Sequence, residues 1–437
     1  MTSERKLFGT DGVRGEAGTF LTAELATSLG RAATASVRSE RPQVLIVRDT
    51  RESGPMLEAA LAAGVAAAGG DALLGGVLPT PAAAIMVRRL GLDLAAVVSA
   101  SHNPYRDNGI KFFSGEGTKL SDETEARMES LLDGDILAAE VGAVRELNGG
   151  LEDYLRALEA AFPLDLSGTK VVLDCANGAT FRAAPAIFER LGAEVETIAA
   201  EPDGRNINDN CGSTHIEGLA ARVADSEATI GFAFDGDGDR VLAVDGSGRP
   251  HDGDELIALA ALGLSSRGEL NGGVVVTVMS NYGFHQAMEA AGIDVAVTSV
   301  GDRYVLDEMR RRDWVLGGEQ SGHIIATDFV ATGDGIAAAL TTMRELGARS
   351  LADATPMRKL PQTLVNVEVA DREAISGADA VWAAVEREGE GLADRGRVLL
   401  RPSGTEPLVR VMVEAPTAEE ADAVCRRLVE IVKNELA

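Results

Sequence analysis

Three aspartates stand at alternate positions in the segment AFDGDGDR, residues 233–240, with glycines between them. Carboxylates this close repel one another, so a loop that keeps them together needs a compensating positive charge. Asp235, Asp237 and Asp239 can direct their oxygens toward a hard divalent cation such as Mg²⁺, leaving a coordination position for a phosphate oxygen. The alternative is a solvated acidic turn. We expect a divalent-cation site on this loop.

The same spacing excludes a helix–loop–helix calcium site. Such a loop needs glycine at its sixth position and glutamate at its twelfth. Counted from Asp235, these positions hold Arg240 and Gly246. The apolar stretches ATIGFAF before the loop and VLAVD after it instead predict two strands, with the aspartates where the first strand ends.

A second polar segment, VVSASHNPYRDNGIKFF at residues 97–113, leaves an apolar strand and turns through Asn-Pro and Asn-Gly dipeptides. Ser101 and His102 lie at the apex of this turn. A serine there can act as a nucleophile, and a phosphorylated serine would supply a further metal ligand. By itself such a segment is more often a structural serine turn, because catalytic pairs form in space rather than in sequence.

The segment LGGEQSGHII, residues 316–325, is a short polar loop after an apolar strand. Its donors and acceptors suit the hydroxyl groups of a sugar, and His323 could transfer a proton. A polar hairpin without function is the equally simple alternative.

The segment RPSGTEPLVR, which begins at residue 401, joins two predicted strands. Its hydroxyls, backbone N–H groups and guanidinium groups form a set that binds phosphate. The candidates are Arg401, Ser403, Gly404, Thr405 and Arg410. A surface turn would not need so many phosphate-binding groups.

A strand, a polar turn, an alanine-rich helix and a second strand follow one another three times, at residues 44–78, 170–200 and 272–300. Apolar strands without alternation, joined through helices, predict parallel sheets that are covered on both faces. Glycines stand where the three helices should end, at Gly69, Gly192 and Gly292. Each motif lies near a predicted strand end, where open α/β sheets bind ligands.

The last part of the chain differs. LVNVEVA, RVLLRPS and PLVRVMVEA read as antiparallel strands, and a helix is predicted from Thr417, capped together with Glu420. The predicted fold class is therefore α/β, with three tandem α/β domains of similar fold and a C-terminal α+β domain. The predicted domains are residues 1–150, 151–250, 251–360 and 361–437.

Composition narrows the possible partners. The 437 residues carry 68 acidic and 41 basic side chains, a formal charge of −27, which disfavours nucleic acid and anionic membranes. Scattered acids with little lysine suit a protein kept in high salt, so a halophilic source is a hypothesis. The sequence shows no apolar run long enough for a membrane span and no secretory signal, and its three cysteines lack paired spacing. We expect a cytoplasmic protein with reduced thiols.

Taken together, SASHNP, DGDGDR, GGEQSGH and RPSGTEP occur in an order and at separations that resemble the α-D-phosphohexomutase family, over nearly the whole chain. FGTDGVRG near the start and SGTEPLVRVMVE near the end are most similar to the branch that acts on glucosamine phosphates. The resemblance implies a heart-shaped molecule with a central cleft. It also implies an isomerase that moves phosphate between the 6- and 1-hydroxyls of a hexose through a phosphoserine and a bisphosphorylated sugar.

The resemblance also implies roles for individual residues. The implied Mg²⁺ ligands are Ser101, Asp235, Asp237 and Asp239. The implied catalytic residues are Ser101, Lys111, His323, Arg14 and His102. The implied sugar-binding residues are Arg240, Asp302, Arg303, Glu319 and Ser321. The implied phosphate-binding residues are Arg401, Ser403, Gly404, Thr405 and Arg410. Cationic neighbours such as Mg²⁺ or Arg14 should lower the pKa of Lys111.

Cofactors and partners follow in the same way. The resemblance implies one Mg²⁺ per active site, a hexose 1,6-bisphosphate activator, a hexose phosphate substrate, and a monomer or homodimer. The alternatives are a phosphoglucomutase or phosphomannomutase of the same family, or a non-catalytic sugar-phosphate sensor. In RPSG the proline replaces the lysine expected in many bacterial relatives, which could alter the rim of the phosphate site.

Overall fold

The computed structural model describes residues 7–9, 11–132, 134, 136, 138–354, 356–403 and 407–436. The chain divides into two units, residues 1–279 with 293–355 and residues 280–292 with 356–437, and each is described by itself.

The larger unit contains three sheets. The first has the order β1 (Val13–Glu16), β5 (Asp107–Ser114), β4 (Leu94–Val98), β2 (Gln43–Arg48), β3 (Asp71–Val77) and β6 (Val144–Glu146). The second has the order β11 (Pro250–His251), β10 (Val241–Asp245), β9 (Ile230–Phe234), β7 (Lys170–Asp174) and β8 (Glu194–Ile198). The third has the order β13 (Asp294–Thr298), β12 (Gly273–Thr277), β14 (Leu316–Gly318), β15 (Ile324–Ala326) and β16 (Val330–Gly333).

All three sheets share one plan. The two strands of each predicted repeat pair in parallel, as do β4, β9 and β14 with the first strand of their repeat. The next strand, β5, β10 or β15, then turns back in an antiparallel hairpin. The predicted α/β class with three similar folds is confirmed, but the sheets are mixed rather than purely parallel because of these hairpins.

The helices of the larger unit are α1 (Ala23–Ser36), α2 (Gly54–Ala67), α3 (Thr80–Arg89), α4 (Asp122–Leu131), α5 (Gly150–Ala161), α6 (Ala183–Arg190), α7 (Glu217–Ala224), α8 (Gly253–Ser266), α10 (Asp302–Arg312) and α11 (Gly335–Leu346).

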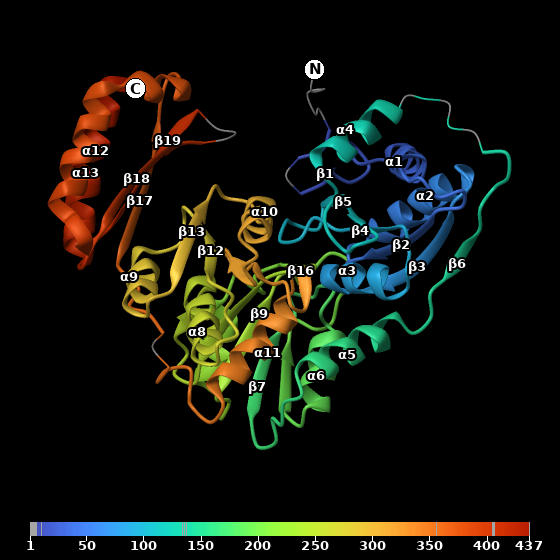
Figure 1. Cartoon of the computed structure of the whole chain (residues 1–437), viewed down its shortest axis with the longest axis horizontal. Coiled ribbons are helices and arrows are strands. Elements are labelled where there is room, and N and C mark those ends of the chain that lie inside the picture. The colour runs from blue at the N-terminus through green and yellow to red at the C-terminus, as the bar shows by residue number, and fades with distance from the viewer. Residues whose placement is uncertain are drawn as a thin grey trace. The chain divides into compact units, whose positions relative to one another are not determined.

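Helices cover both faces of the first sheet. Figure 1 shows α1, α2 and α4 on one side of the sheet and α3 on the other. Val44 and Ile46 of β2 are buried in the core that α1, α2 and α4 share. Their neighbours Leu45 and Val47 are buried too, so the strand has no polar face.

The predicted helix ends are confirmed by backbone conformation. Gly69, Gly192 and Gly292 have φ values of 88°, 96° and 67°, and each follows the last residue of its helix by two positions. Glycine adopts this left-handed conformation without a steric cost, which lets it end a helix.

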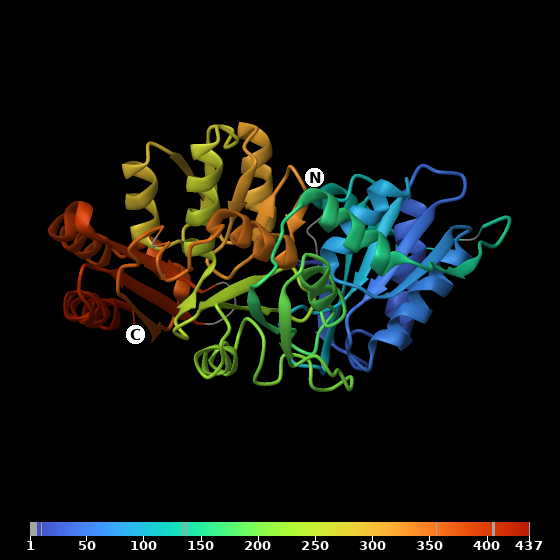
Figure 2. The same ribbon diagram turned by 90° about the horizontal axis from the view of Figure 1, so that it is seen from below.

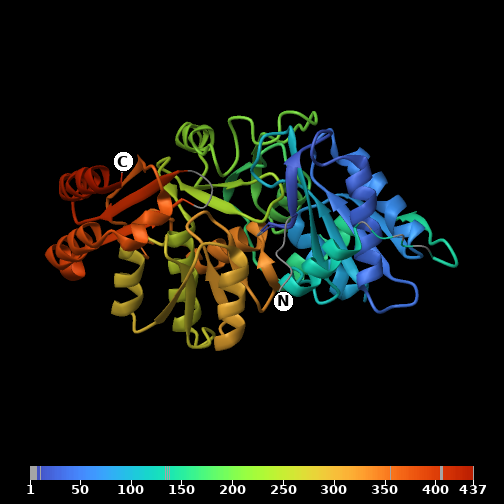
Figure 3. The ribbon, with the colours of Figure 1, turned by 90° about the horizontal axis from the view of Figure 1, so that it is seen from above.

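The smaller unit is an antiparallel sheet of order β17 (Gln362–Glu368), β19 (Leu408–Glu414) and β18 (Arg397–Pro402). Its helices are α9 (Tyr282–Ala290), α12 (Asp379–Leu392) and α13 (Ala418–Leu436), with 3₁₀ turns η1 (Arg372–Gly377) and η2 (Ala393–Arg395). Figures 1, 2 and 3 agree that α12 and α13 lie on the same face of the sheet. The predicted C-terminal helix is confirmed: Thr417 Oγ1 accepts the N–H of Glu420 at 3.2 Å, and Val424 and Leu428 are buried.

All three cysteines are free thiols, and burial raises the pKa of Cys425 to about 11. Within the described residues, no helix is both long and apolar enough to cross a bilayer.

A buried carboxyl caps α11. Asp334 is 2% exposed, accepts the N–H of Ala337 at 3.0 Å, and accepts the Tyr154 hydroxyl at 3.0 Å. Burial raises the pKa of Asp334 to about 7. The folded state therefore holds this proton more tightly than the unfolded state, and the stability that the proton contributes is lost as pH rises from about 4 to 7.

We expect Asp334→Asn to remove this pH dependence, because the amide oxygen keeps the cap without a charge. The difference in the free energy of unfolding, variant minus wild type, should increase by on the order of 2 kcal/mol when the pH is raised from 5 to 8. Denaturant unfolding at both pH values measures the difference. Asp252→Asn, at the partly exposed N-cap of α8, is the control. An Asp334→Asn difference that stays constant with pH would contradict the expectation.

Candidate active site

Three predicted site segments occupy the same position in their sheets. Residues 99–106 join β4 to β5, residues 235–240 join β9 to β10, and residues 319–323 join β14 to β15. Each is therefore the connection of the antiparallel hairpin that follows the repeat. The second and third connections touch directly, since the N–H of Val241 donates to Gly322 O at 3.1 Å.

The serine loop meets the aspartate loop. Ser101 Oγ donates to Asp235 Oδ2 at 2.5 Å, although the two residues are 134 positions apart. Carboxylate oxygens of Asp235, Asp237 and Asp239 lie within 4.8 Å of one another. All four side chains are buried.

Cationic side chains surround the three carboxylates. Lys111 Nζ lies 2.5 Å from Asp237 Oδ2 and 3.6 Å from Asp239 Oδ2, and this lysine is only 2% exposed. His323 Nδ1 lies 3.7 Å from Asp239 Oδ2, and Arg240 Nε lies 3.9 Å from Asp239 Oδ1. The protein itself thus supplies part of the positive charge that the aspartates require.

The ionisable groups of this cluster have pKa values that are shifted in opposite directions. Burial, with the charges of Asp239 and Asp237, raises the pKa of Asp235 well above its usual range. The pKa of Asp239 lies well below its usual range, because Lys111 and His323 lower it by more than burial raises it. The pKa of Lys111 is raised: burial lowers it, but Asp237 and Asp239 outweigh burial. Among the side-chain neighbours of Lys111 the carboxylates outweigh Arg14, so Arg14 alone does not lower its pKa below the usual value, and the lowering expected from Mg²⁺ stays a prediction.

The donor set fits a divalent cation. Asp237 Oδ1 and Asp239 Oδ1 are buried and have no hydrogen-bond partner among the described residues. A buried carboxylate oxygen without a donor is costly, and a metal ligand bond would satisfy it. Three carboxylates beside a serine oxygen match the oxygen preference of Mg²⁺. Asp235, Asp237 and Asp239 could therefore hold one ion.

Other predicted residues line the same region. His102 Nδ1 lies 3.3 Å from Ser101 Oγ, and burial, with Arg240 and Arg14, lowers the pKa of His102 to about 4. Arg14 donates to Ala100 O at 3.5 Å. His102, a member of the serine loop, thus lies beside the serine oxygen, and Arg14 contacts the same loop from β1.

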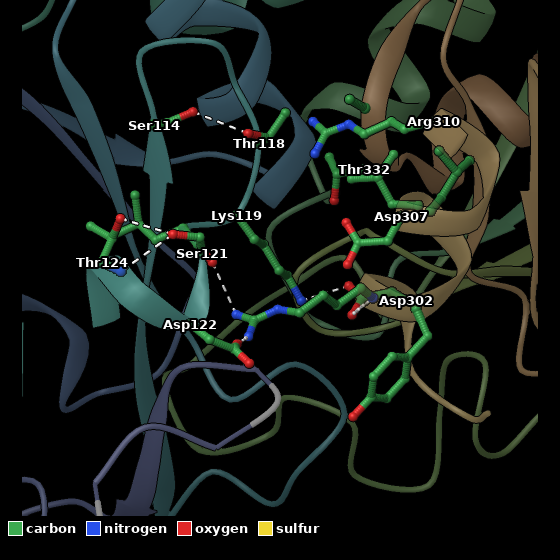
Figure 4. Close-up of a pocket in the computed structure, with 16 residues that line it drawn as sticks. Ser114, Thr118, Lys119, Ser121, Asp122, Thr124, Asp302, Asp307, Arg310 and Thr332 are labelled. Atoms are coloured by element: carbon green, nitrogen blue, oxygen red, sulfur yellow. Dashed lines mark hydrogen bonds and ion pairs between the residues drawn. The ribbon is translucent and has the colours of Figure 1, made fainter. Parts of the chain in front are cut away.

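A lysine that the motifs did not single out joins the third sheet to the first. Lys119 Nζ contacts Asp302 Oδ2 at 2.5 Å (Figure 4). The same nitrogen also contacts Asp11. His323 Nε2 lies 3.6 Å from the same Asp302 oxygen. The pKa of Asp302 falls to about 2, because Lys119 and His323 lower it by more than burial raises it. Lys119 and Asp302 line a cavity of about 410 Å³.

The remaining sugar-binding candidates differ in accessibility. Glu319 accepts the N–H of Gly301 at 2.9 Å and is 9% exposed, whereas Ser321 is exposed. The guanidinium group of Arg303 bonds to the first turn of α4, at Asp122 and at Glu125 (3.1 Å to the latter).

The phosphate-binding candidates lie in the smaller unit. Arg401 of β18 is the direct cross-strand partner of Arg410 on β19. Burial and Arg410 lower the pKa of Arg401. Like charges directly opposite each other destabilise a sheet, and an anion between them would relieve this. Ser403 is buried nearby in the chain, and Gly404 and Thr405 lie outside the described residues.

Sequence reasoning missed several residues that support the serine loop. Asp49 and Arg51 follow β2, and Asn208 lies in the turn-rich segment that follows β8. The Arg51 and Asn208 side chains donate to backbone oxygens, and Asp49 pairs with Arg51 and accepts the Ser99 hydroxyl. No motif spacing in the sequence reveals these contacts. Their one available signal is position, because Asp49 and Arg51 follow a strand at the same sheet edge as Ser101.

Comparison with known proteins extends these observations. Models of the phosphoglucomutase/phosphomannomutase family match in order: α/β/α domain I at residues 5–136, domain II at 152–248, domain III at 252–360 and the C-terminal domain at 364–431. A solved structure of a phosphoglucomutase/phosphomannomutase family protein from Burkholderia thailandensis is 26% identical, has a TM-score of 0.83, and is similar over 98% of this chain and 97% of that one.

Curated relatives are closer in sequence. A phosphoglucosamine mutase of Moorella thermoacetica is 51% identical over 435 residues, 96% of this chain and 97% of that protein. A phosphoglucosamine mutase of Nocardioides sp. is 49% identical over 445 residues, 99% of each chain. With family models along nearly its whole length and a relative half identical to it, the chain belongs to the phosphoglucomutase/phosphomannomutase family, as its four motifs predict.

Proposed function

We propose that the protein is an isomerase that interconverts glucosamine 6-phosphate and glucosamine 1-phosphate through a phosphorylated Ser101 and a bisphosphorylated sugar. The observation that carries the proposal is the Ser101 hydroxyl, buried 2.5 Å from Asp235 within the aspartate cluster. A nucleophile beside a site for a divalent cation suits phosphoryl transfer. The names of the relatives that are about half identical support the amino sugar as substrate.

In the proposed reaction, the bond from phosphorus to Ser101 Oγ breaks as a bond from phosphorus to the free sugar oxygen forms. The hydroxyl proton of the sugar leaves, and Ser101 Oγ gains a proton. We assign this proton transfer to Lys111 and His323, because both are buried beside the aspartates. The bisphosphorylated sugar then turns, and its other phosphate returns to Ser101.

The residues that would hold Mg²⁺ are Asp235, Asp237, Asp239 and the phosphate on Ser101. A cation bound there supplies positive charge to the phosphoryl oxygens and to the serine oxygen as its bond breaks. The burial of all three aspartates excludes water, which favours transfer to the sugar over hydrolysis.

We propose that the phosphate that does not react binds at Arg401, Ser403, Gly404, Thr405 and Arg410. The cross-strand pairing of Arg401 with Arg410 supports this, since it places two cationic residues side by side on the sheet, where a phosphate can bind both. Glu319 and Ser321 would contact the sugar, with Asp302 and Arg240 beside them, whereas Arg303 would act through its bonds to α4. We also propose the four-domain division at residues 150, 250 and 360.

Comparison of three hexose 6-phosphates tests the substrate. We expect kcat/KM for glucosamine 6-phosphate to exceed that for glucose and mannose 6-phosphates by about 10-fold or more, since one polar group recognised by a site is worth that much. The assay contains Mg²⁺ and a trace of hexose bisphosphate, at low and at molar salt, which also tests the proposed halophilic adaptation. A preference for either neutral sugar would replace the proposed substrate. Activity with none of them would favour the sensor.

A further inference from the structure

Two side chains that are distant in sequence hold the backbone of the serine loop. Arg51 Nη2 donates to Ser101 O and to Asn103 O, at 2.9 Å in each case. Asn208 Nδ2 donates to the same two oxygens, at 2.9 and 3.2 Å. Both carbonyl oxygens therefore have one donor from the first repeat and one from the segment that follows β8.

The conformation of Ser101 makes these bonds necessary. Its φ is 53°, in the left-handed region that costs a residue with a Cβ about 1–2 kcal/mol. Such a conformation persists only where the surroundings hold it. The N–H of Ser101 donates to Ser99 Oγ at 3.0 Å. The backbone N–H and C=O of Ser101 are therefore both hydrogen-bonded, in addition to the bond that its hydroxyl makes with Asp235.

Arg51 forms a rigid base on one side of the loop. It is 0% exposed and paired with Asp49, also 0% exposed, at 2.8 Å from Nε to Oδ2. A further Arg51 nitrogen donates to Pro104 O at 2.5 Å. Removing Arg51 would leave the Asp49 charge buried and unpaired, at a cost of about 3–5 kcal/mol, so this residue is a poor one to test.

Asn208 connects the loop to the part of the chain that bears the aspartates. Asn208 is 8% exposed, and its backbone N–H donates to Ala176 O at 2.9 Å. The orientation of its amide is fixed by chemistry, since both partners are carbonyl oxygens, which only accept. Gly236, next to Asp235, lies so close that a Cβ there would come within 2.5 Å of Ser101 O. The serine and aspartate loops therefore meet at the atoms that Asn208 holds.

We infer that Asn208 is a positioning residue of the phosphoryl transfer: by bonding the carbonyl oxygens of Ser101 and Asn103, it sets where Ser101 Oγ lies relative to Asp235. The inference rests on the proposed function. Reacting atoms must be placed closely, and a displacement of about 1 Å can cost roughly 100-fold in rate. Among the described residues, the hydrogen bonds of the Asn208 side chain to the serine loop go to backbone oxygens rather than to Ser101 Oγ, so its effect should appear in kcat rather than in KM.

The test compares Asn208→Gly with Asn210→Gly. Both asparagines have positive φ, 57° and 52°, so glycine removes the side chain without backbone strain. The Asn210 side chain is exposed and bonds only to Asp209 among the described residues. For Asn208→Gly we expect kcat to fall about 10- to 100-fold with KM within about twofold. Asn210→Gly should match wild type.

A second readout needs no substrate. Hydrogen exchange should quicken several-fold in the peptide containing residues 99–104 of Asn208→Gly, and stay unchanged in Asn210→Gly. Equal kcat and equal exchange in the two variants would overturn the inference. Loss of kcat that merely tracks a loss of folded protein would overturn it as well, because that is a structural role. If wild type itself did not convert glucosamine 6-phosphate, the proposed function would fail, and exchange would still decide whether Asn208 holds the loop.

Discussion

Ser101→Ala should abolish mutase turnover, lowering kcat by at least about 10⁴-fold, the scale on which loss of a covalent nucleophile acts. The reason is that no other hydroxyl in the described structure bonds to Asp235 in place of Ser101. The fold should persist, because the change removes only the hydrogen bonds of one hydroxyl, to Asp235 and to His102, worth about 1 kcal/mol each. Coupled assay of glucosamine 1-phosphate formation measures kcat, and thermal melting checks the fold.

Ser130→Ala is the matched control, since Ser130 Oγ donates only to Arg127 O on the exposed side of α4. Intact-mass measurement after incubation with hexose bisphosphate adds a direct test: wild type and Ser130→Ala should each gain one phosphoryl group, and Ser101→Ala none. A Ser101→Ala enzyme that keeps a tenth or more of the wild-type rate would rule out the covalent route.

The repeated architecture was predictable because it depends on residues that are close together in the sequence. Apolar strands, alanine-rich helices and helix-ending glycines such as Gly192 can each be recognised from a few consecutive residues. The position of the motifs at strand ends was also visible. The hairpin at each motif was not predicted as a shared feature, because pairing direction depends on a strand's partner rather than on its own residues.

Contacts made through the backbone were beyond reach of the sequence. Asn208 bonds two carbonyl oxygens about a hundred residues away, and any asparagine in a turn has the same local signature. Arg303 shows the same limit. Its guanidinium group bonds to Asp122 and Glu125 of α4. Only folding brings that helix to Arg303, so its motif does not reveal these bonds, and its expected sugar contact stays a prediction.

Removal of divalent cations should reduce turnover by about 10³-fold or more, because charge stabilisation by a metal is worth several kcal/mol. Added Mg²⁺ should restore the rate. The ligand set predicts one ion per chain, which Mn²⁺ titration followed by electron paramagnetic resonance would count. Asp237→Asn should weaken Mn²⁺ binding by more than the 10- to 100-fold that outer-shell changes cost, since it replaces a carboxylate whose Oδ1 is buried without a hydrogen-bond partner in the described structure.

Asp225→Asn is the control that distinguishes the loss of a metal ligand from the loss of a negative charge elsewhere on the protein. Asp225 ends α7 in the same part of the chain and is exposed, so its replacement removes the same charge from a protein of −27 without touching the cluster. Screening in ordinary buffer confines that change to its surroundings. Mn²⁺ affinity should therefore be unchanged in Asp225→Asn and lost in Asp237→Asn. Equal weakening in both variants would mean that the acidic surface, rather than the three buried carboxylates, attracts the ion.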